Sequence, residues 1–257
     1  MGQKKVINRT MAIYVLWLRQ IKKYLRSKAR IISSLGQPLL FLIAFGFGFG
    51  HIFSQAGEGN YINFLAPGIV GMAIIFSAMF AGIEIIWDRQ FGFLKETLVA
   101  PVSRASIAFG RTMGGATIAM IQGLLVLLIS TAIGFRPDSI LSILATVGVM
   151  FILALLFTGL GTAIATQMRD MQAFPIIMNF IMMPLFFLSG SLFPLEGLPK
   201  SLEAFVNVNP VSYGMDALRG LLSGTFHYSF GLDILVISLI TAVVLFVSTL
   251  LFKRIEI

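Results

Sequence analysis

Cysteine is absent from the 257-residue sequence, and histidine occurs only twice, at His51 and His227. The absence of cysteine excludes structural disulfides and thiol catalysis. The HExxH and GxSxG motifs of zinc proteases and serine hydrolases are also missing, and no Asp, Glu and His residues stand at the spacing of metal ligands. We therefore predict that the chain has no catalytic residues and no metal site.

A nucleotide-binding loop is missing too. No glycine is followed by lysine anywhere in the sequence, so the GxxxxGK[ST] loop that holds ATP phosphates cannot form. The chain is thus predicted not to be an enzyme and to bind no cofactor itself. If its function consumes energy, ATP and Mg²⁺ must be bound by a partner, most simply a separate ATPase subunit.

Charged residues are scarce, at 12% of the chain against roughly a quarter in soluble domains, whereas 57% of the residues are hydrophobic and the mean hydropathy is +0.92. This composition predicts an integral membrane protein of the all-α class. A transmembrane helix needs roughly twenty predominantly apolar residues. The sequence supplies six such runs, at Ile32–Phe53, Tyr61–Trp87, Ser106–Phe135, Ile140–Thr166, Phe174–Phe193 and Asp233–Phe252.

The distribution of Lys and Arg predicts how these spans are oriented. About half of the 19 basic residues precede Ile31, and with both termini inside only Arg136, Lys200 and Arg219 would lie outside. Because basic connections stay in the cytoplasm, we predict a multi-pass protein of the cell membrane with both termini cytoplasmic. The same pattern accounts for the net charge of +8 without a nucleic-acid partner.

Residues 1–30 precede the first span and contain basic residues but no acidic one. From Thr10 onward apolar residues recur every three or four positions, and the basic residues lie mostly on the opposite face. This periodicity predicts a cytoplasmic amphipathic helix on the inner leaflet, with Trp17 and Tyr24 at headgroup depth and the lysines in contact with anionic membrane lipid. A soluble basic tail is the alternative.

The cytoplasmic connection between the second and third spans, residues 88–105, is unusually long and highly charged. It contains a short amphipathic segment in which Phe91, Leu94 and Leu98 recur at helical spacing. A charged helix of about two turns cannot lie in lipid, so it must project into water, where another protein could bind it.

The second long connection, residues 194–232, is external in this topology. It contains two predicted helices, Leu198–Val206 and one that begins near Pro210 and ends near Ser223. Both are too short and too polar to span, which predicts a re-entrant hairpin that is buried against protein in the outer leaflet. Asp216 and Arg219 stand three residues apart on the second helix and are expected to interact.

Ionisable residues are scarce within the spans, and Glu84 is the nearest to one that could sit at mid-membrane. It lies one turn before Asp88, near the inner end of the second span. We expect it to form a structural salt bridge with Arg104 or Arg111, and a proton relay is the alternative.

Glycines recur at close spacing in three spans. Gly46 and Gly50 stand four residues apart, as do Gly110 and Gly114, and Gly159 and Gly161 lie in the fourth span. Small residues four positions apart favour close helix contact. The alternative is that glycine is simply common in membrane helices.

Two motifs resemble those of type-2 ABC transporter permeases, the membrane subunits of drug, antibiotic and polysaccharide exporters. The run Arg89-x-x-Gly92-x-Leu94-x-x-x-Leu98-x-x-Pro101 resembles the coupling-helix region of that family. Leu188-Ser189-Gly190, followed by Asn209-Pro210-Val211-Ser212-Tyr213 and then Arg219, is similar to the family signature, with Val211 as a mild departure. The resemblance covers essentially the whole chain and is close to the daunorubicin-resistance-like permeases, whose fold also occurs in ABCG-type half transporters.

The resemblance implies a homodimer, or a dimer with a related permease, above two ATPase subunits. A coupling helix at Phe91–Val99 would dock on the ATPase, and the turn Gln167–Gln172 would make a minor second contact. The residues that would couple to the ATPase are Phe91, Gly92, Leu94, Lys95, Glu96, Leu98, Arg169 and Asp170. A structural or gating role is expected for Glu84, Arg111, Pro210, Tyr213, Asp216 and Arg219.

The second and fifth spans would line the substrate path, as the resemblance implies. Both are rich in Met and Phe and lack a charge at mid-membrane, and the candidate residues are Met72, Phe76, Met79, Phe80, Met178, Met182 and Phe186. Because methionine-rich surfaces adapt to varied apolar shapes, we expect export of a lipophilic or amphiphilic compound, such as a drug, an antibiotic or a lipid. The alternatives are that these residues only pack the bundle or face lipid, that the cargo is a lipid-linked polysaccharide or glycolipid, or that the chain is a channel or structural protein outside the ABC class.

Overall fold

The computed structural model describes residues 9–55, 61–193 and 199–255. Across these ranges the chain is helical and contains no strand, which confirms the predicted all-α class. The predicted helix start at Leu198 falls outside the described residues. The helices are α1 (Arg9–Arg26), α2 (Lys28–Gln55), α3 (Tyr61–Phe80), α4 (Ile83–Gln90), α5 (Phe93–Val99), α6 (Arg104–Ile133), α7 (Ile140–Gln167), α8 (Ala173–Phe187), α9 (Lys200–Val208), α10 (Pro210–Ser223) and α11 (Phe230–Lys253).

Five segments of the described chain are long and apolar enough to cross a membrane, at Lys28–Gly50, Tyr61–Gln90, Arg104–Ile133, Ser142–Gln167 and Phe230–Lys253. The sixth predicted span, Phe174–Phe193, corresponds to the shorter helix α8, which ends at Phe187 after 15 residues. The chain turns immediately afterwards, where Gly190 has a φ of +75°, a conformation that favours glycine. Helix length therefore supports five crossings, and the sixth stays a prediction.

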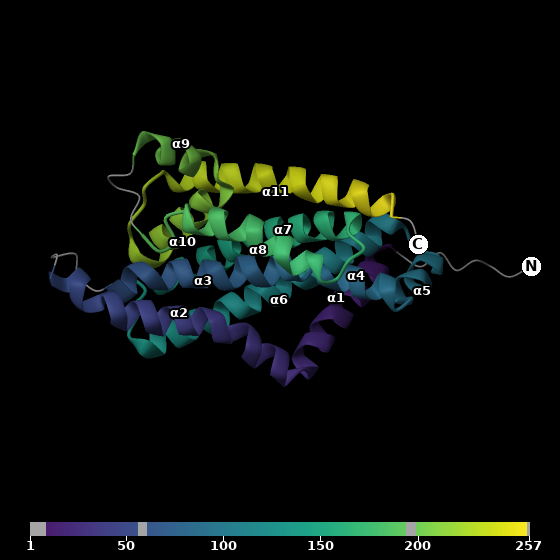
Figure 1. The fold of residues 1–257 in the computed structure, drawn as a ribbon, viewed down its shortest axis with the longest axis horizontal. Helices are drawn as coiled ribbons and strands as arrows, with labels where there is room; N and C mark the ends of the chain where they lie inside the picture. The colour runs from purple at the N-terminus through teal and green to yellow at the C-terminus, as the bar shows by residue number, and fades with distance from the viewer. Residues whose placement is uncertain (1–8, 56–60, 194–198, 256–257) are drawn as a thin grey trace, which may run out of the picture.

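The long helices lie side by side along the long axis of the molecule (Figure 1). The segment that contains α3 is the most buried of the five, whereas α2 and α11 are the most exposed. The short helix α5 and the last turns of α11 lie at one end of the bundle, which we call the α5 end, and α9 and α10 lie at the opposite end, the α10 end (Figure 1). The two long connections predicted from the sequence therefore occupy opposite ends of the molecule.

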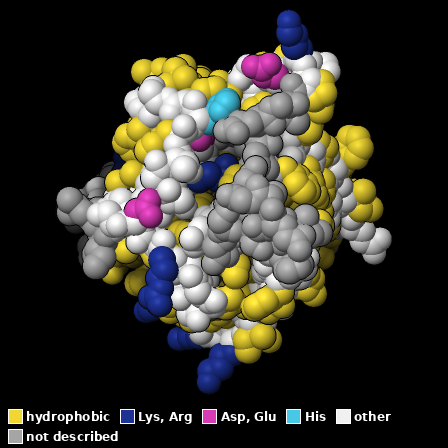
Figure 2. Space-filling model, turned by 90° about the vertical axis from the view of Figure 1, so that its left-hand side faces the viewer, with side chains coloured by type: hydrophobic (Ala, Val, Ile, Leu, Met, Phe, Trp, Pro, Cys, Tyr) yellow, Lys and Arg dark blue, Asp and Glu magenta, His cyan; other side chains and the backbone are white. Residues whose placement is uncertain are grey.

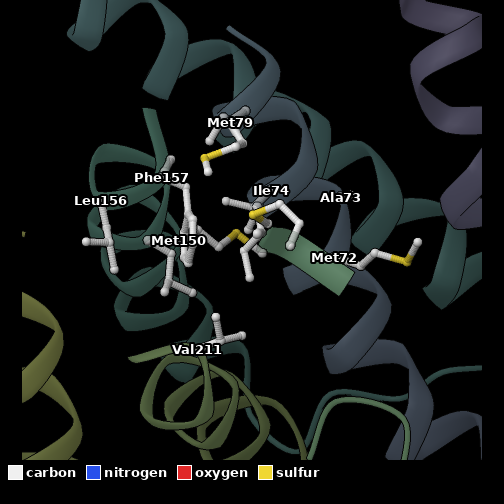
Figure 3. Packing of buried hydrophobic residues seen from close by; sticks show 14 of the residues in the cluster. Met72, Ala73, Ile74, Met79, Met150, Leu156, Phe157 and Val211 are labelled. Atoms are coloured by element: carbon white, nitrogen blue, oxygen red, sulfur yellow. The ribbon is translucent and has the colours of Figure 1, made fainter. Parts of the chain in front are cut away.

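Buried side chains of α3, α7 and α10 form the centre of the core. In Figure 3, Met79 of α3 points toward Phe157 of α7, and Val211 of α10 closes the other end of this group. The side chain of Met72 extends away from it, toward the opposite side of α3 (Figure 3). The two methionines of α3 therefore have different surroundings.

The helix α1 packs against α6, with a sharp corner between α1 and α2 (Figure 1). A methyl group on Gly110 or Gly114 would meet α1 within about 3 Å, so these glycines allow α1 and α6 to approach closely. Close helix contact therefore explains their spacing better than the general frequency of glycine in membrane helices. Trp17 Nε1 donates to Thr117 Oγ1 at 3.0 Å, and Tyr24 is buried. Both side chains therefore contact α6, and their predicted position at headgroup depth stays a prediction.

The predicted second span is interrupted, since α3 ends at Phe80 and α4 begins at Ile83. Gly82 lies at this break, and a methyl group there would overlap the carbonyl group of Gly161 in α7. Conversely, a methyl group on Gly161 would overlap the carbonyl oxygen of Met79. The backbones of the two segments are thus in direct contact, which only glycine at both positions allows.

We expect Gly161→Ala to lower the stability of the folded protein by about 1–3 kcal/mol, because the added methyl group must push two backbones apart. The measurement is the apparent melting temperature of the detergent-purified protein. Gly148→Ala is the matched control, since Gly148 lies in the same helix and has no atom within 4 Å of the added methyl group. Equal melting temperatures for the two variants would contradict the close contact.

Candidate functional site

The connection between α4 and α5 contains a tight turn at Gly92. Its φ of +81° lies in the left-handed region, where glycine is favoured because it has no Cβ. The helix after it, α5, runs from Phe93 to Val99. The expected tight entry at Gly92 is therefore confirmed. The predicted start of the helix at Phe91 is wrong by two residues, because Phe91 caps the end of α4 and α5 begins at Phe93.

The apolar residues of α5 face two directions. Leu94 is fully buried, so the expectation that it fills a groove in another protein is wrong. Leu98 is partly buried and packs against the hydrophobic core of its own chain. Phe91, just before the helix, is 68% exposed, in agreement with its predicted contact role. Phe93 and Val99, which were not among the predicted contacts, are 50% and 83% exposed. The apolar face that the leucine spacing predicted therefore exists, but it packs against the same chain.

Two side chains at the end of α4 bind the turn that follows α7. Arg89 donates to the carbonyl oxygens of Thr166 and Met168, both at 3.0 Å, and Gln90 donates to that of Arg169 at 3.2 Å. These bonds satisfy carbonyl groups at the C-terminal end of α7 that have no partner within the helix. The structure therefore brings the two predicted ATPase contacts together.

The predicted coupling residues outside the core are exposed at this end. Lys95 and Glu96 lie on the outer side of α5, and Arg169 and Asp170 lie in the turn after α7. Asp170 Oδ1 accepts from the backbone N–H of Gln172 at 2.7 Å and so shapes that turn. Together with Phe91, Phe93 and Val99, these four residues form what we call the α5 surface.

Glu84 forms ion pairs with partners that the sequence did not indicate. Its Oε1 lies 3.1 Å from Lys23 Nζ of α1 and 3.1 Å from Arg30 Nη1 of α2. The expected pairing with Arg104 or Arg111 is wrong, because the corner between α1 and α2 brings the two basic residues of the N-terminal segment to the start of α4. Glu84 therefore holds this corner against α4.

The two expected partners of Glu84 have other roles. Arg111 of α6 pairs with Asp88 of α4, and their side chains are 5% and 11% exposed. Arg104 donates to the carbonyl oxygens of Lys253 at 2.7 Å and Ile255 at 3.1 Å. The first pair joins α4 to α6, and the second set of bonds joins the start of α6 to the end of α11.

A cavity of about 340 Å³ lies between α1, α2, α3, α4, α6 and α7. Met72, Phe76 and Phe80 of the predicted substrate path line it, as do Glu84 and Arg111. Met79 does not line it, since that side chain is part of the core against α7 (Figure 3). The cavity is thus formed inside one chain.

The predicted path residues of α8 are not open to this cavity or to the surface. Met178, Met182 and Phe186 are fully buried, and Phe186 contacts Phe76 of α3 edge to face at 6.2 Å. The exposed face of α8 instead carries other apolar residues, of which Phe180 is 82% exposed. The two halves of the predicted path therefore contact each other within one chain.

The helix α10 begins as predicted at Pro210 and ends at Ser223. Asn209 caps it by accepting from the backbone N–H of Val211 at 3.0 Å. Tyr213 stacks on Tyr228 with ring centroids 4.9 Å apart and donates its hydroxyl proton to a backbone carbonyl in α9 at 2.7 Å. Basic side chains are scattered over the surface of the α10 end, without forming one patch (Figure 2).

Asp216 and Arg219 contact different backbone segments. The Asp216 carboxylate accepts from the backbone N–H groups of His227 and Tyr228 at 2.8 and 2.7 Å, whereas Arg219 donates to the Gly190 carbonyl at 2.7 Å. Burial lowers the pKa of Arg219 to about 10, and the nearby Asp216 partly opposes that shift. The structure contains no ion pair between these two side chains within the described ranges, so the expected contact is replaced by two separate links.

Comparison with known proteins decides the family. The profile described as "ABC-2 type transporter" matches residues 11–223. The chain belongs to the ABC-2 type transporter family. Members of this family are transport permease subunits that normally work with ATPase subunits. Within the described residues of this chain, no group of three or more His, Asp or Glu side chains could hold a metal ion.

Three relatives illustrate the range of this ABC-2 family. The chain is 33% identical to "Putative transport permease ycf38" of Pyropia yezoensis over 227 residues, covering 82% of this chain and 74% of that protein. It is 25% identical to "Nodulation protein J" of Rhizobium meliloti, covering 88% and 86%. It is 26% identical to "Probable doxorubicin resistance ABC transporter permease protein DrrC" of Mycobacterium tuberculosis, covering 80% and 75%.

Proposed function

We propose that this chain is the permease subunit of an ATP-driven exporter and that the α5 surface is where the ATPase subunit binds. The observation that carries the proposal is the exposure of Phe93 and Val99 on α5 and of Phe91 just before it, while the buried Leu94 holds this helix against the rest of the chain. Large apolar side chains on a charged end of a membrane protein are typical of a protein interface. The membership in the ABC-2 family supports an ATPase as the protein that covers them.

The arrangement of the α5 end supports coupling as well as binding. Arg89 and Gln90 join α4 to the end of α7, and Arg104 joins α6 to the end of α11. A displacement of α5 would therefore move the ends of several spans together. In the proposed assembly two permeases, identical or related, work with two ATPase subunits, and the α5 end with both termini faces the cytoplasm.

The proposed cargo is a lipophilic or amphiphilic compound. The cavity beside α3 supports this, because Met72, Phe76 and Phe80 give it an apolar wall. A relative whose name refers to doxorubicin resistance also supports a cargo of this kind.

The test is to change the α5 surface without disturbing the fold. We expect Phe93→Asp combined with Val99→Asp to weaken ATPase binding by tenfold or more, since each lost apolar anchor typically costs about 1–4 kcal/mol of binding. The measurement is the ATPase activity that co-purifies with the tagged chain from its native membrane. Unchanged melting temperature would show that the membrane part is intact.

The matched control is Phe205→Asp, which makes the same change at an exposed residue of α9 at the opposite end. It should leave co-purified ATPase activity unchanged. An undiminished activity in the double variant would refute the assignment of the surface. The absence of any ATPase with a GxxxxGK[ST] loop in the wild-type preparation would refute the proposed function itself.

A further inference from the structure

The cavity between α1, α2, α3, α4, α6 and α7 is lined by both apolar and charged side chains. Its lining combines the apolar side chains of Met72, Phe76 and Phe80 with the charged side chains of Arg30, Glu84 and Arg111. Its volume of about 340 Å³ is within the range of small-molecule sites, roughly 300–1,000 Å³. A ligand that fits such a cavity must combine a hydrocarbon part with a polar head.

The polar residues of this cavity have unused hydrogen-bond donors. Trp87 Nε1, Arg111 Nη1 and the hydroxyl of Thr158 belong to residues that line the cavity, and each is buried without a hydrogen-bond partner in the described part of the chain. Arg111 itself is only 6% exposed. Two of these three groups can only donate. A buried donor without an acceptor is costly. A ligand whose head group carries acceptor oxygens would remove this cost.

The charged residues next to the cavity also favour a ligand with acceptor oxygens, and in particular an anionic one. Lys23, Arg30 and Arg111 are cations, and they are paired with only two carboxylates, Glu84 and Asp88. The cluster therefore retains one net positive charge in partly buried surroundings. A negatively charged head group would neutralise it, whereas a cationic one would be repelled.

We propose that this cavity binds a single-chain amphiphile with an anionic head group, a carboxylate or a phosphate, whose hydrocarbon chain lies along Phe76 and Phe80. The head group accepts hydrogen bonds from the donors of Trp87 and Arg111 and lies near Arg30. This is the cavity that supports the proposed cargo, so the inference rests on that part of the proposed function and names the class of compound. Its test uses the single chain without a second permease or an ATPase, so it can fail while the ATPase assignment stands, and the reverse.

Tryptophan fluorescence gives a direct test, because the chain contains only two tryptophans, Trp17 and Trp87. In a Trp17→Phe background, Trp87 of the cavity is the only emitter. Purified full-length protein in detergent is titrated with 9,10-dibromostearate, with brominated lysophosphatidate and with brominated lysophosphatidylcholine. We expect saturable quenching by the carboxylate or the phosphate probe, at least tenfold tighter than by the zwitterionic probe, as expected for a hydrogen-bonded charged head group.

Two variants separate binding in the cavity from quenching by the micelle. Ser77→Phe places a ring in the cavity that Ser77 lines, and we expect it to remove saturable quenching, while Ser77→Ala retains it. Arg30→Gln should weaken binding by about tenfold, with Glu84 still paired to Lys23. Lys95→Gln removes an exposed cation of α5 and should have no effect.

Three results would overturn the proposal. One is saturable quenching that is the same in Ser77→Phe and in the parent protein, which would place the probe outside the cavity. Another is equal affinity for the zwitterionic and anionic probes, and the third is an unchanged affinity in Arg30→Gln. The melting temperature and the Trp87 emission maximum of each variant without probe establish that it is folded.

Discussion

Asp88→Ala should destabilise the folded protein by about 3–5 kcal/mol, the largest effect that we expect from a single substitution. Asp88 pairs with Arg111, and their exposed fractions are 8% and 6%. Removing one partner of a buried ion pair leaves the other charge uncompensated in surroundings of low dielectric constant, which costs much more than the pair itself contributes. The measurement is the apparent melting temperature in detergent, together with the yield of folded protein.

A double variant distinguishes this explanation from a general loss of packing. Asp88→Leu with Arg111→Met removes both charges at once, and we expect it to recover most of the lost stability, because replacing a buried pair by apolar residues is often neutral or stabilising. Asp170→Ala removes an exposed carboxylate at the same end of the bundle and should have little effect. A double variant that is less stable than Asp88→Ala would show that the ion pair is not the cause.

Composition and periodicity predicted those parts of the fold that depend on local sequence. The start of α10 is predicted by Pro210, which suits a first helical turn, and its observed end at Ser223 agrees. Long apolar runs predicted the segments that are long enough to span. The early end of α8 was not predicted, because Phe174–Phe193 is predominantly apolar. The turn at Gly190 is held by a distant residue, since its carbonyl accepts from Arg219 of α10.

The α5 surface shows where sequence reasoning fails for a short helix. Leu94 and Leu98 stand at helical spacing, and such spacing indicates that a face is buried without indicating which protein buries it. In the structure this face contacts its own chain, and Phe93 and Val99 remain for a partner. The sequence did contain a signal for the exposed face, because Phe93 and Val99 are apolar residues of this seven-residue helix that do not share the spacing of the leucines.

Ion-pair partners could not be predicted from distance along the chain. Glu84 contacts Lys23 and Arg30, which precede it by more than fifty residues. Their meeting depends on the packing of α1 against α6 and on the corner that follows, which is a tertiary feature without a local sequence pattern. The N-terminal helix itself was predictable from periodicity, whereas the surface on which it lies was not.

We expect Arg219→Met to destabilise the protein by about 2–4 kcal/mol and to increase amide hydrogen exchange in α9 and α10. Arg219 Nη2 donates to the Gly190 carbonyl at 2.7 Å, and its guanidinium lies 4.0 Å from the ring centre of Phe64 in α3. A hydrogen bond from a charged donor contributes about 1.5–3 kcal/mol, and a desolvated cation–π contact contributes up to about 2 kcal/mol. Both are lost with methionine, which also leaves the buried carbonyl without its donor.

Lysine at this position should not restore the wild-type stability. Although Arg219→Lys retains the positive charge, an ammonium group cannot lie flat on Phe64 while it donates to Gly190, since it lacks the planar fork of arginine. Lys200→Met removes an exposed cation at the same end and is the matched control, with an expected change below about 0.5 kcal/mol. If Arg219→Lys matched the wild type in melting temperature and in hydrogen exchange, charge alone would hold the α10 end to α3, and the geometric explanation would be wrong.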